Sequence, residues 1–428
     1  MASGDGTKLD AVVFGATGFT GKYTVIELAK LAKEKGNIKW GVAGRNKEKL
    51  EKLLADLSEK TGADLKKIPV LVADVSDEAS LKEMAASTLL VINCVGPYRF
   101  YGEAVVKACV AEGCHHVDVS GEPQYMERMQ LNYHDAAKEK GVYVVSACGF
   151  DSIPADLGTV FLTKNFQGDV NSVETYLEWR MKKNVSGPSI HFGTFESAVF
   201  GLANARELRP LREKLFPKRL PQMLPKQKPR WLVHKSSVVG KWCLPFPGSD
   251  RSVVMRSQRH FFEQDKQRPV QAQAYVAFHS LLAVVGVVLV GGVIGVLSRS
   301  NLGRKLLLKY PGFFTGGMVS HEGPSEELME NTEFSLMVRG EGWQEKLAEP
   351  TDQHSEPPNK TMTVKVKGTN PGYGATCTML VMSALTILKE ADKMPGRGGV
   401  YPPGAAFANT SLVEELDKHG VTFQVSAS

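Results

Sequence analysis

The chain has 428 residues, enough for two or three domains, and its 23% charged and 43% hydrophobic residues are typical of a globular protein. The net charge of +6 comes without a nucleic-acid motif that carries base-stacking aromatics, so nucleic acid is not an expected partner. The six cysteines form no C-x-x-C pair and no zinc-like Cys/His spacing, which indicates reduced core thiols and no metal site.

The chain begins with a polar stretch, Met1 to Leu9, that lacks the apolar run of a secretory signal, so we expect an intracellular protein. Four apolar residues then lead into a turn with Gly-x-x-Gly-x-x-Gly spacing, and a helix-like run follows. This order is that of a dinucleotide-binding βαβ unit, whose backbone amides and helix N-terminus receive a pyrophosphate. The spacing is usual in reductases whose nucleotide carries an extra phosphate. We expect cofactor contacts from Gly15, Thr17, Gly18, Phe19 and Thr20.

Residues 9 to 150 alternate short apolar strands with amphipathic helices. After the first strand we expect strands at 38–45, 70–74, 89–95, 114–119 and 142–146, and helices at 47–60, 81–86, 102–112 and 124–140. About six parallel strands with intervening helices predict an α/β, Rossmann-type doubly wound sheet.

Arg45 ends the second expected strand, where NAD-binding units usually carry Asp or Glu for the ribose hydroxyls. A guanidinium suits a 2′-phosphate instead, so the sequence predicts NADP(H); the alternative is a solvated loop residue. Asp74 ends the third strand, where it can reach the adenine edge, but Asp before Ser-Asp also commonly forms a turn.

The fourth strand ends in Asn93-Cys-Val-Gly-Pro-Tyr98, at the strand edge where ligands bind in this architecture. We expect Cys94, Val95, Gly96 and Pro97 to form a wall beside the nicotinamide ribose, with a simple turn as the alternative. After the last strand, Gly149 to Gly158 is an interdomain corner in which Pro154 opens a helix and Asp151 or Ser152 is a candidate N-cap. This corner should border the cleft.

Taken together, the segments Gly15–Gly21, Ala43–Arg45, Asn93–Tyr98 and Gly149–Asp156 resemble the saccharopine dehydrogenase family. The similarity is closest to its subgroup of saccharopine dehydrogenase-like oxidoreductases, and bacterial trans-acting enoyl reductases are similar too. It extends into Ser189–Thr194 and Gly398–Phe407, and so covers nearly the whole chain. The resemblance implies a nucleotide domain, residues 1–150, and a mixed α/β second domain, residues 151–428. It leaves the substrate open, and it associates the animal subgroup with membranes and lipid droplets.

In the second domain an alternating strand is expected at 172–179, followed by a turn-helix unit. His191 is a candidate proton donor there, although a lone histidine near a glycine turn is more often structural. Residues 206–235 carry ten Lys and Arg against two Glu, and five prolines break any long helix. This segment is either an exposed basic insertion or a contact for an anionic membrane surface.

Residues 280–297 carry no charge, and a helix of this length spans about 27 Å, just short of a bilayer core of about 30 Å. Basic residues on both sides argue against a clean crossing. A hairpin at Gly291-Gly292 could dip into one leaflet, with Leu302 to Phe314 in the interface. We therefore expect 278–314 to bind a membrane or a lipid-droplet monolayer on the cytosolic side; the alternative is a buried core helix.

The remaining chain has ordinary globular patterning. We expect paired antiparallel strands at 332–338 and 361–367 with a polar hairpin loop at 344–360, a helix at 375–391, a loop at 395–403, and a final helix and strand at 412–420 and 421–425. Tyr401 to Phe407 are expected to close over the cleft, and 405–428 to pack back on the first domain.

Candidate proton donors for reduction by NADPH are Tyr98, Asp151 and His191, of which Tyr98 ranks first because its loop should face the nicotinamide. The absence of a Tyr-x-x-x-Lys pair disfavours short-chain dehydrogenase chemistry. The leading hypothesis is an NADP-dependent oxidoreductase acting on a lipid-like carbonyl or enoyl substrate, as a monomer or homo-oligomer. The alternatives are an NADP-binding lipid-droplet protein with a structural or sensing role, and soluble saccharopine reduction.

Overall fold

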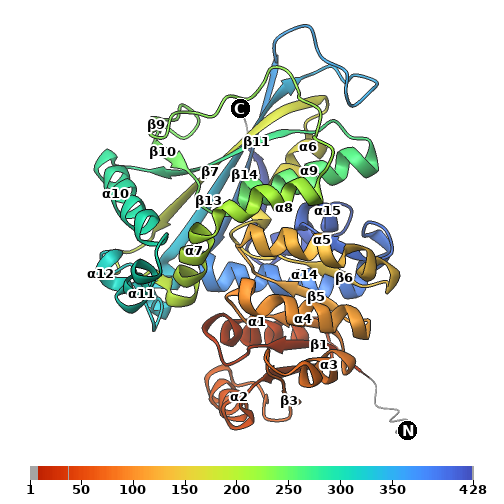
Figure 1. Cartoon of the computed structure of the whole chain (residues 1–428), viewed down its shortest axis with the longest axis vertical. Coiled ribbons are helices and arrows are strands. Elements are labelled where there is room, and N and C mark those ends of the chain that lie inside the picture. Colours follow the sequence, from red (N-terminus) through yellow and green to blue (C-terminus); the bar gives the residue numbers. More distant parts are fainter. Residues whose placement is uncertain (1–7, 37, 427–428) are drawn as a thin grey trace.

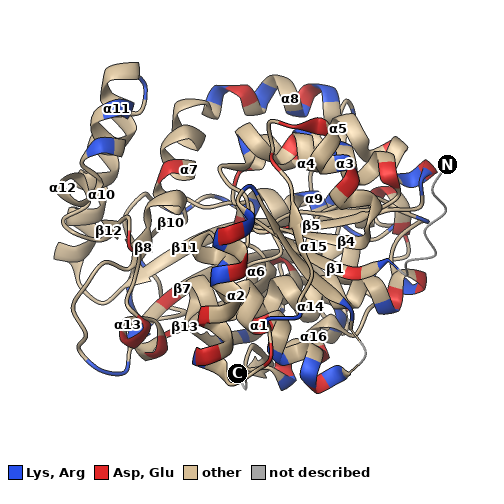
Figure 2. Ribbon diagram, turned by 90° about the horizontal axis from the view of Figure 1, so that it is seen from below, with Lys and Arg blue, Asp and Glu red and all other residues tan. Residues whose placement is uncertain are grey.

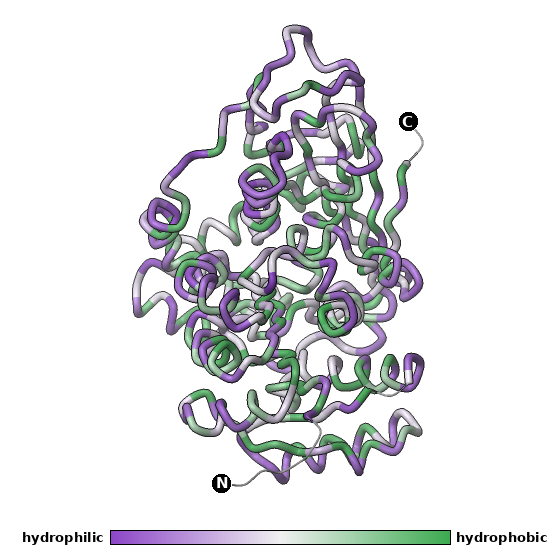
Figure 3. Tube along the Cα trace, turned by 90° about the vertical axis from the view of Figure 1, so that its right-hand side faces the viewer, coloured by the Kyte–Doolittle hydropathy of each residue, from purple (hydrophilic) through white to green (hydrophobic). Residues whose placement is uncertain are grey.

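The computed structural model describes residues 8–36 and 38–426, in which two seven-stranded sheets lie one above the other in Figure 1. Most of the polar stretch from Met1 to Leu9 therefore lies outside the described residues. Figure 3 shows hydrophobic residues throughout the interior, and the largest buried cluster contains residues of both sheets, among them Val13 of the first and Leu336 of the second.

The first sheet is wholly parallel and has the order β15-β6-β5-β4-β1-β2-β3, which confirms the expected Rossmann-type sheet. Phe14 of β1 lies beside Ala43 of β2 and Asn93 of β4, so these strands end at one common edge. Its strands are β1 (Leu9–Phe14), β2 (Trp40–Gly44), β3 (Val70–Val72), β4 (Thr88–Asn93), β5 (His115–Asp118), β6 (Tyr143–Val145) and β15 (Gly399–Tyr401).

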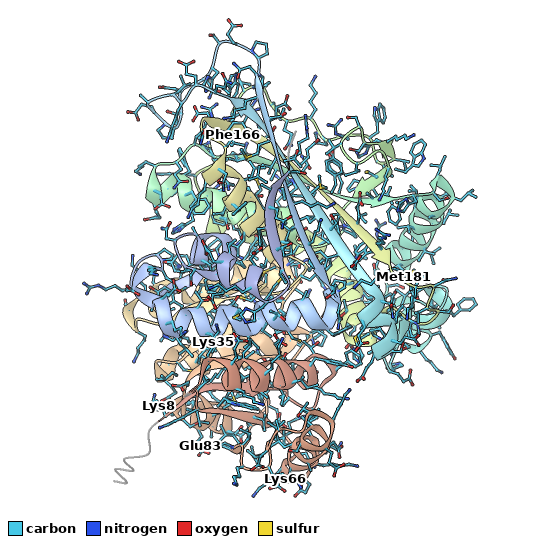
Figure 4. All side chains as sticks on the ribbon, turned by 180° about the vertical axis from the view of Figure 1, so that it is seen from behind. Lys8, Lys35, Lys66, Glu83, Phe166 and Met181 are labelled. Carbon is cyan, nitrogen blue, oxygen red and sulfur yellow. The ribbon has the colours of Figure 1, made fainter. Side chains whose placement is uncertain are left out.

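Helices cover both faces of this sheet because alternate strand residues point to opposite sides. Val12 and Phe14 pack under α3 (Glu78–Ala86) and α4 (Tyr98–Glu112), beside which lies α5 (Pro123–Glu139). Ala11 and Val13 face the opposite layer, made of α1 (Phe19–Lys35), α2 (Lys47–Thr61) and α14 (Thr376–Glu390). Figure 4 shows α14 lying alongside α1, although the two helices are far apart in the sequence.

The second sheet is mixed and has the order β16-β14-β13-β7-β11-β10-β9. Strands β13 and β14 pair antiparallel with Leu336 opposite Val366, as expected, and β7 pairs parallel with β11. Helices α6 (Ile153–Asn165) and α9 (Asp250–Asp265) pack against this sheet. Its strands are β7 (Asp169–Met181), β9 (His234–Lys235), β10 (Trp242–Pro245), β11 (Gln271–Phe278), β13 (Thr332–Trp343), β14 (Lys360–Thr369) and β16 (Thr422–Ser426).

The remaining elements are a small third sheet and further helices. A small sheet pairs β8 (Ile190–His191) with β12 (Val319–Ser320). The helices are α7 (Phe192–Ala203), α8 (Leu208–Leu215), α10 (Leu281–Leu297), α11 (Asn301–Lys309), α12 (Pro311–Phe314), α13 (Glu326–Asn331), α15 (Pro403–Phe407) and α16 (Leu412–Lys418). Short turns of other helix types occur at Ala205–Glu207, Pro371–Ala375 and Ala391–Lys393.

Two expectations for the C-terminal segment are wrong. The expected loop 395–403 contains β15, which pairs with β6 and completes the first sheet. Tyr401 and Phe407 do not close over a cleft, because both are buried and α15 packs between α6 and α9. The chain then places α16 against α14, and Glu415 of α16 pairs with Lys35 of α1 at 2.6 Å. It ends with β16 in the second sheet. The division at residue 150 stays a prediction.

The basic segment 206–235 is tied to the body rather than being a free insertion. Arg212 pairs with Glu127 at 2.7 Å, and Arg230 pairs with Glu174 at 2.7 Å. Pro210 is accommodated near the start of α8, because a helix's first turn needs no amide donor there. Two of its cations are therefore paired with acids that lie elsewhere in the sequence.

The apolar segment folds differently from both expected forms. Helix α10 runs unbroken through Gly291-Gly292, so the hairpin at these glycines is wrong; the chain turns at Ser298–Ser300 instead. The buried-core alternative is also wrong, because within α10 Val284 is the buried residue and most others are exposed. Among the described residues, one helix is long and apolar enough to cross a membrane, Pro371–Lys393, but 78% of its 18-residue apolar stretch is buried inside the molecule, so it is a core helix.

Candidate functional site

The glycine turn after β1 depends on close backbone contacts. Gly15 has φ of +81°, and a Cβ there would lie 2.7 Å from Cγ2 of Val95. A Cβ on Gly21 would overlap the Gly15 carbonyl oxygen, so α1 packs directly on the turn. Gly18 closes the turn by donating its N–H to the Gly15 carbonyl at 2.9 Å. Gly15 and Gly21 therefore require glycine for steric reasons.

The N-terminus of α1 is suited to a phosphate. Gly18 is its N-cap, so no side chain caps the helix, and its first turn holds no acidic residue. Thr17 and Gly18 are exposed there. Such a helix end presents amide donors and a positive dipole to solvent. The residues present therefore fit the pyrophosphate of a dinucleotide.

Arg45 and Asp74 follow neighbouring strands, β2 and β3, at the same edge. Arg45 is exposed, while the next residue, Asn46, caps α2 by accepting from the Lys49 N–H at 2.7 Å. Asp74 accepts from the backbone and hydroxyl of Ser76 at 2.9 and 2.8 Å. These bonds, with a smaller effect of Arg45, lower the pKa of Asp74. Asp74 thus forms the turn and lies in the field of the Arg45 cation.

The loop between β4 and α4 is held from both sides. Asn93 accepts from the Val95 N–H at 3.0 Å, and Glu122 accepts from the N–H groups of Tyr98 and Arg99 at 2.9 and 3.1 Å. Cys94 lies 3.5 Å from the Thr24 hydroxyl of α1, and burial raises its pKa to about 12. The segment from Cys94 to Pro97 is therefore a fixed wall next to the glycine turn, which Val95 contacts.

Two of the candidate proton donors are committed to structural roles. Tyr98 is 6% exposed, donates its hydroxyl to the Asn93 carbonyl at 3.0 Å, and has a pKa raised well above its ordinary value by burial. His191 caps α7, because its Nδ1 accepts from the Gly193 N–H at 3.1 Å. Its ring stacks on Phe19 of the glycine turn, with centroids 4.7 Å apart. His191 thus lies at the site but contributes packing.

Asp151 lies between β6 and α6, where the carboxyl ends of the strands meet. Its Oδ2 is 2.7 Å from the position of a Cβ on Gly121, in the loop after β5. Burial raises the pKa of Asp151. The pKa of the neighbouring Asp250, which is only 4% exposed, is raised by burial and by the charge of Asp151. Neither Asp151 nor Ser152 caps α6 through its side chain, because the Ser152 hydroxyl bonds to Ser249 at 3.0 Å.

Further polar residues at this edge were missed by the sequence reasoning. Asp118 ends β5 beside Asn93 and accepts from Tyr125 and Ser146 at 3.0 and 2.8 Å. Its place at a strand end is the signal that could have identified it. Glu122, Glu196 and Asp250 follow no such pattern, because they come from loops and helices that only the fold brings together.

The carboxyl edge of the parallel first sheet carries a glycine turn, a helix without a side-chain cap and a fixed wall opposite them. These features define a dinucleotide-binding oxidoreductase fold. Residues 11–145 match the family model of the saccharopine dehydrogenase NADP binding domain. The chain belongs to the saccharopine dehydrogenase family, among the saccharopine dehydrogenase-like oxidoreductases, and its cofactor is NADP(H).

The most similar relatives cover nearly the whole chain. The saccharopine dehydrogenase-like oxidoreductase of Homo sapiens is 40% identical over 97% of both chains. The lipid droplet localized protein of Caenorhabditis elegans is 39% identical over 98% of this chain and 99% of its own. The solved apo saccharopine dehydrogenase (L-Glu forming) from Saccharomyces cerevisiae has a TM-score of 0.54 at 13% identity, covering 98% of this chain and 100% of its own, so it shares the fold.

Proposed function

We propose that the protein transfers hydride between NADP(H) and an apolar or lipid-like substrate at a membrane or lipid-droplet surface. The observation that most supports this proposal is the position of α7. At its N-terminus His191 stacks on Phe19 of the glycine turn. Further along, Phe195 and Val199 pack in one cluster with Ile294 of α10 and Leu307 of α11. The exposed apolar helix is thus separated from the nucleotide site by a single helix.

In this proposal the cofactor lies across the carboxyl edge of the first sheet. Gly15, Thr17, Gly18, Phe19 and Thr20 hold the pyrophosphate, and Arg45 holds the 2′-phosphate, with Asp74 fixing the neighbouring turn. The segment from Cys94 to Pro97 borders the nicotinamide ribose. The bound nucleotide supplies the hydride chemistry, and the protein supplies orientation and a proton.

Asp151 is the proposed proton donor and acceptor. It lies at the strand edge, it is partly accessible, and burial raises its pKa toward the neutral range. A carboxyl in this range can both hold and release a proton under physiological conditions. The hydroxyl of Tyr98, by contrast, is bound to a backbone carbonyl inside the strand layer.

The lipid-surface location is supported by α10 and by the name of the worm relative. Leu282, Leu289 and Val296 of α10 are 83%, 65% and 66% exposed, which is unusual for large apolar side chains of a water-soluble protein. A substrate drawn from such a surface would itself be apolar.

The test is NADPH oxidation by the purified full-length protein in a cellular lipid extract. We expect NADPH to be consumed with formation of a reduced lipid. Asp151→Asn should lower turnover by about a hundredfold or more while NADPH affinity stays within about twofold. Arg45→Ala should weaken binding of NADPH but not of NADH.

Other outcomes favour other functions. Tight NADPH binding without oxidation in any extract would support a structural or sensing role. Undiminished turnover in Asp151→Asn would remove this residue from the chemistry and leave the cofactor assignment intact.

A further inference from the structure

An exposed apolar surface continues beyond α10 onto two neighbouring segments. Trp231 and Leu232, in the loop before β9, are 86% and 60% exposed. On the other side, Leu302 of α11 and Phe313 of α12 are 70% and 83% exposed. Clusters of this size are rare on soluble proteins without a partner.

Packing fixes these segments on either side of α10. Val233, the residue after Leu232, packs in one cluster with Val284 and Val288 of the helix. At the other end, Ile294 and Leu297 pack with Leu307 and Phe314 of α11 and α12. The Trp231 loop therefore lies beside the first half of α10, and α11 and α12 lie beside its second half, as Figure 1 shows for β9, α10 and α11.

The same contacts determine how α10 is oriented relative to a lipid layer. The helix begins directly after β11, and the chain that follows it returns to the body through the buried Leu307. Because both ends are attached to the body along its side, α10 lies along the surface and does not project through a bilayer. A helix apolar on all sides then enters a lipid layer by about its own width, roughly 10 Å.

The rim of this surface is basic. No Asp or Glu occurs between Asp265 and Glu322, or between Glu213 and Asp250. Exposed cations flank the apolar residues on both sides, namely Lys226, Lys228, Lys235, Arg299, Lys305 and Lys309. Figure 2 shows α10 itself without charge and basic residues on α11. Cations around an apolar centre complement phosphate headgroups over acyl chains.

We propose that α10, α11–α12 and the loop around Trp231 form one docking surface for an anionic phospholipid layer. The inference deepens the proposed lipid-surface function by naming the partner's chemistry. Trp231 and Tyr310 lie at the level of the headgroups, where aromatic side chains concentrate in membrane proteins. The protein is thereby monotopic and docks on a single anionic phospholipid leaflet.

The experiment measures flotation of the full-length protein with vesicles, without cofactor or substrate, so it is independent of catalysis. One vesicle is pure phosphatidylcholine, and in the other about a quarter of the lipid is phosphatidylserine. We expect much stronger binding to the second, falling with added salt. The double variant Lys305→Glu/Lys309→Glu should lose about tenfold or more on the anionic vesicles. Trp231→Ala should weaken binding to both vesicles.

The matched control is Lys66→Glu/Lys67→Glu, the same charge change at two exposed residues far from α10. Lys66 is labelled at the bottom of Figure 4. Binding of this control should equal that of the wild type. Equal binding to both vesicles would overturn the inference of anionic headgroups, but it would still support binding to a lipid surface. Binding to neither, or a stable dimer that occludes α10, would overturn both. Failure of NADPH oxidation alone would overturn only the proposed reaction.

Discussion

Asp118 and Asp156 are fully buried carboxyls that differ in how well their hydrogen bonds compensate for burial. Asp118 accepts from the Ser120 N–H, the Tyr125 hydroxyl and the Ser146 hydroxyl. Asp156 accepts from the Ser257 hydroxyl at 2.8 Å and the Gly404 N–H at 2.6 Å through Oδ2, and its Oδ1 has no partner among the described residues. Burial still dominates, and it raises the pKa of each carboxyl to about 6.

Asp156 should make the stability of the protein fall as the pH rises. Its folded pKa of about 6 exceeds the unfolded value near 4, so the native state binds the proton more tightly. The stabilisation is complete below the unfolded pKa and is lost as the pH rises through 6, by on the order of 3 kcal/mol. Asp156→Asn removes this titration. Urea unfolding at several pH values should show the variant gaining on the wild type between about pH 4 and 7.

A difference between wild type and Asp156→Asn that stays constant with pH would contradict the argument.

At this scale the sequence placed Arg45 and the glycine turn at strand ends, where the structure has them, because apolar runs mark where strands stop. Their contacts with the cofactor stay predictions. It ranked Tyr98 first among the proton donors, whereas the hydrogen bond of the Tyr98 hydroxyl leads us to propose Asp151 instead. The order of residues places Tyr98 at the start of a helix, but only the fold shows that its ring turns back under β4 and bonds to the Asn93 carbonyl.

Helix α7 connects elements that the sequence keeps far apart. Its C-terminal carbonyls are held by the first sheet's helices, since Arg99 donates to the Phe200 carbonyl at 3.3 Å and Gln124 to the Gly201 carbonyl at 3.2 Å. Its N-terminus contacts the glycine turn through His191. Such long-range side-chain to backbone bonds leave no periodic pattern, so the sequence predicted a helix here but not its neighbours.

The contact between α1 and the glycine turn should tolerate no side chain at Gly21. A Cβ there would overlap the Gly15 carbonyl oxygen and approach the Ala16 Cα at 2.8 Å. Gly21→Ala should therefore displace α1, destabilise the protein by about 1–3 kcal/mol and weaken NADPH binding strongly. Thermal unfolding and nucleotide fluorescence titration measure these effects. In Gly286→Ala, where no atom lies within 4 Å, both properties should stay unchanged or improve slightly; unaltered NADPH affinity in Gly21→Ala would contradict the argument.

The failed hairpin prediction in the apolar segment has a physical reason. Two glycines weaken a helix without breaking it, and α10 is capped at its start by Ser280, which accepts from the Leu282 N–H at 3.2 Å. The chain turns instead at Ser300, which caps α11 by accepting from the Gly303 N–H at 2.9 Å. That serine was a readable cap signal. Strand β15 was missed because three residues are too few to show alternation.

The last 53 residues of the chain, from α14 onward, contribute to both sheets. Helix α14 supplies Met379 and Leu380, both fully buried, to the core that α1 shares, and β15 lies at the edge of the first sheet. Strand β16 then extends the second sheet. The sequence pattern predicts most helices and strands, but it cannot show that a helix near the end of the chain covers a sheet built from its beginning.

Residues 1–150 alone should not fold. Without α14 and β15, part of one face and one edge of the first sheet are open, and Leu28 and Leu31 lose partners in their buried cluster. We expect the isolated fragment to show no cooperative thermal transition and no NADPH binding, by circular dichroism and fluorescence, while the full chain shows both. A sharp melting transition of the fragment would make residue 150 a true domain boundary.

The late return of α14, β15 and β16 also sets the order of events during synthesis. The ribosome delivers α10 before any of the three segments that complete the two sheets. For that interval the nascent chain presents its most apolar helix while neither core is closed. Encounter with a lipid surface before release would therefore shield this helix at the stage when the chain is most prone to aggregate.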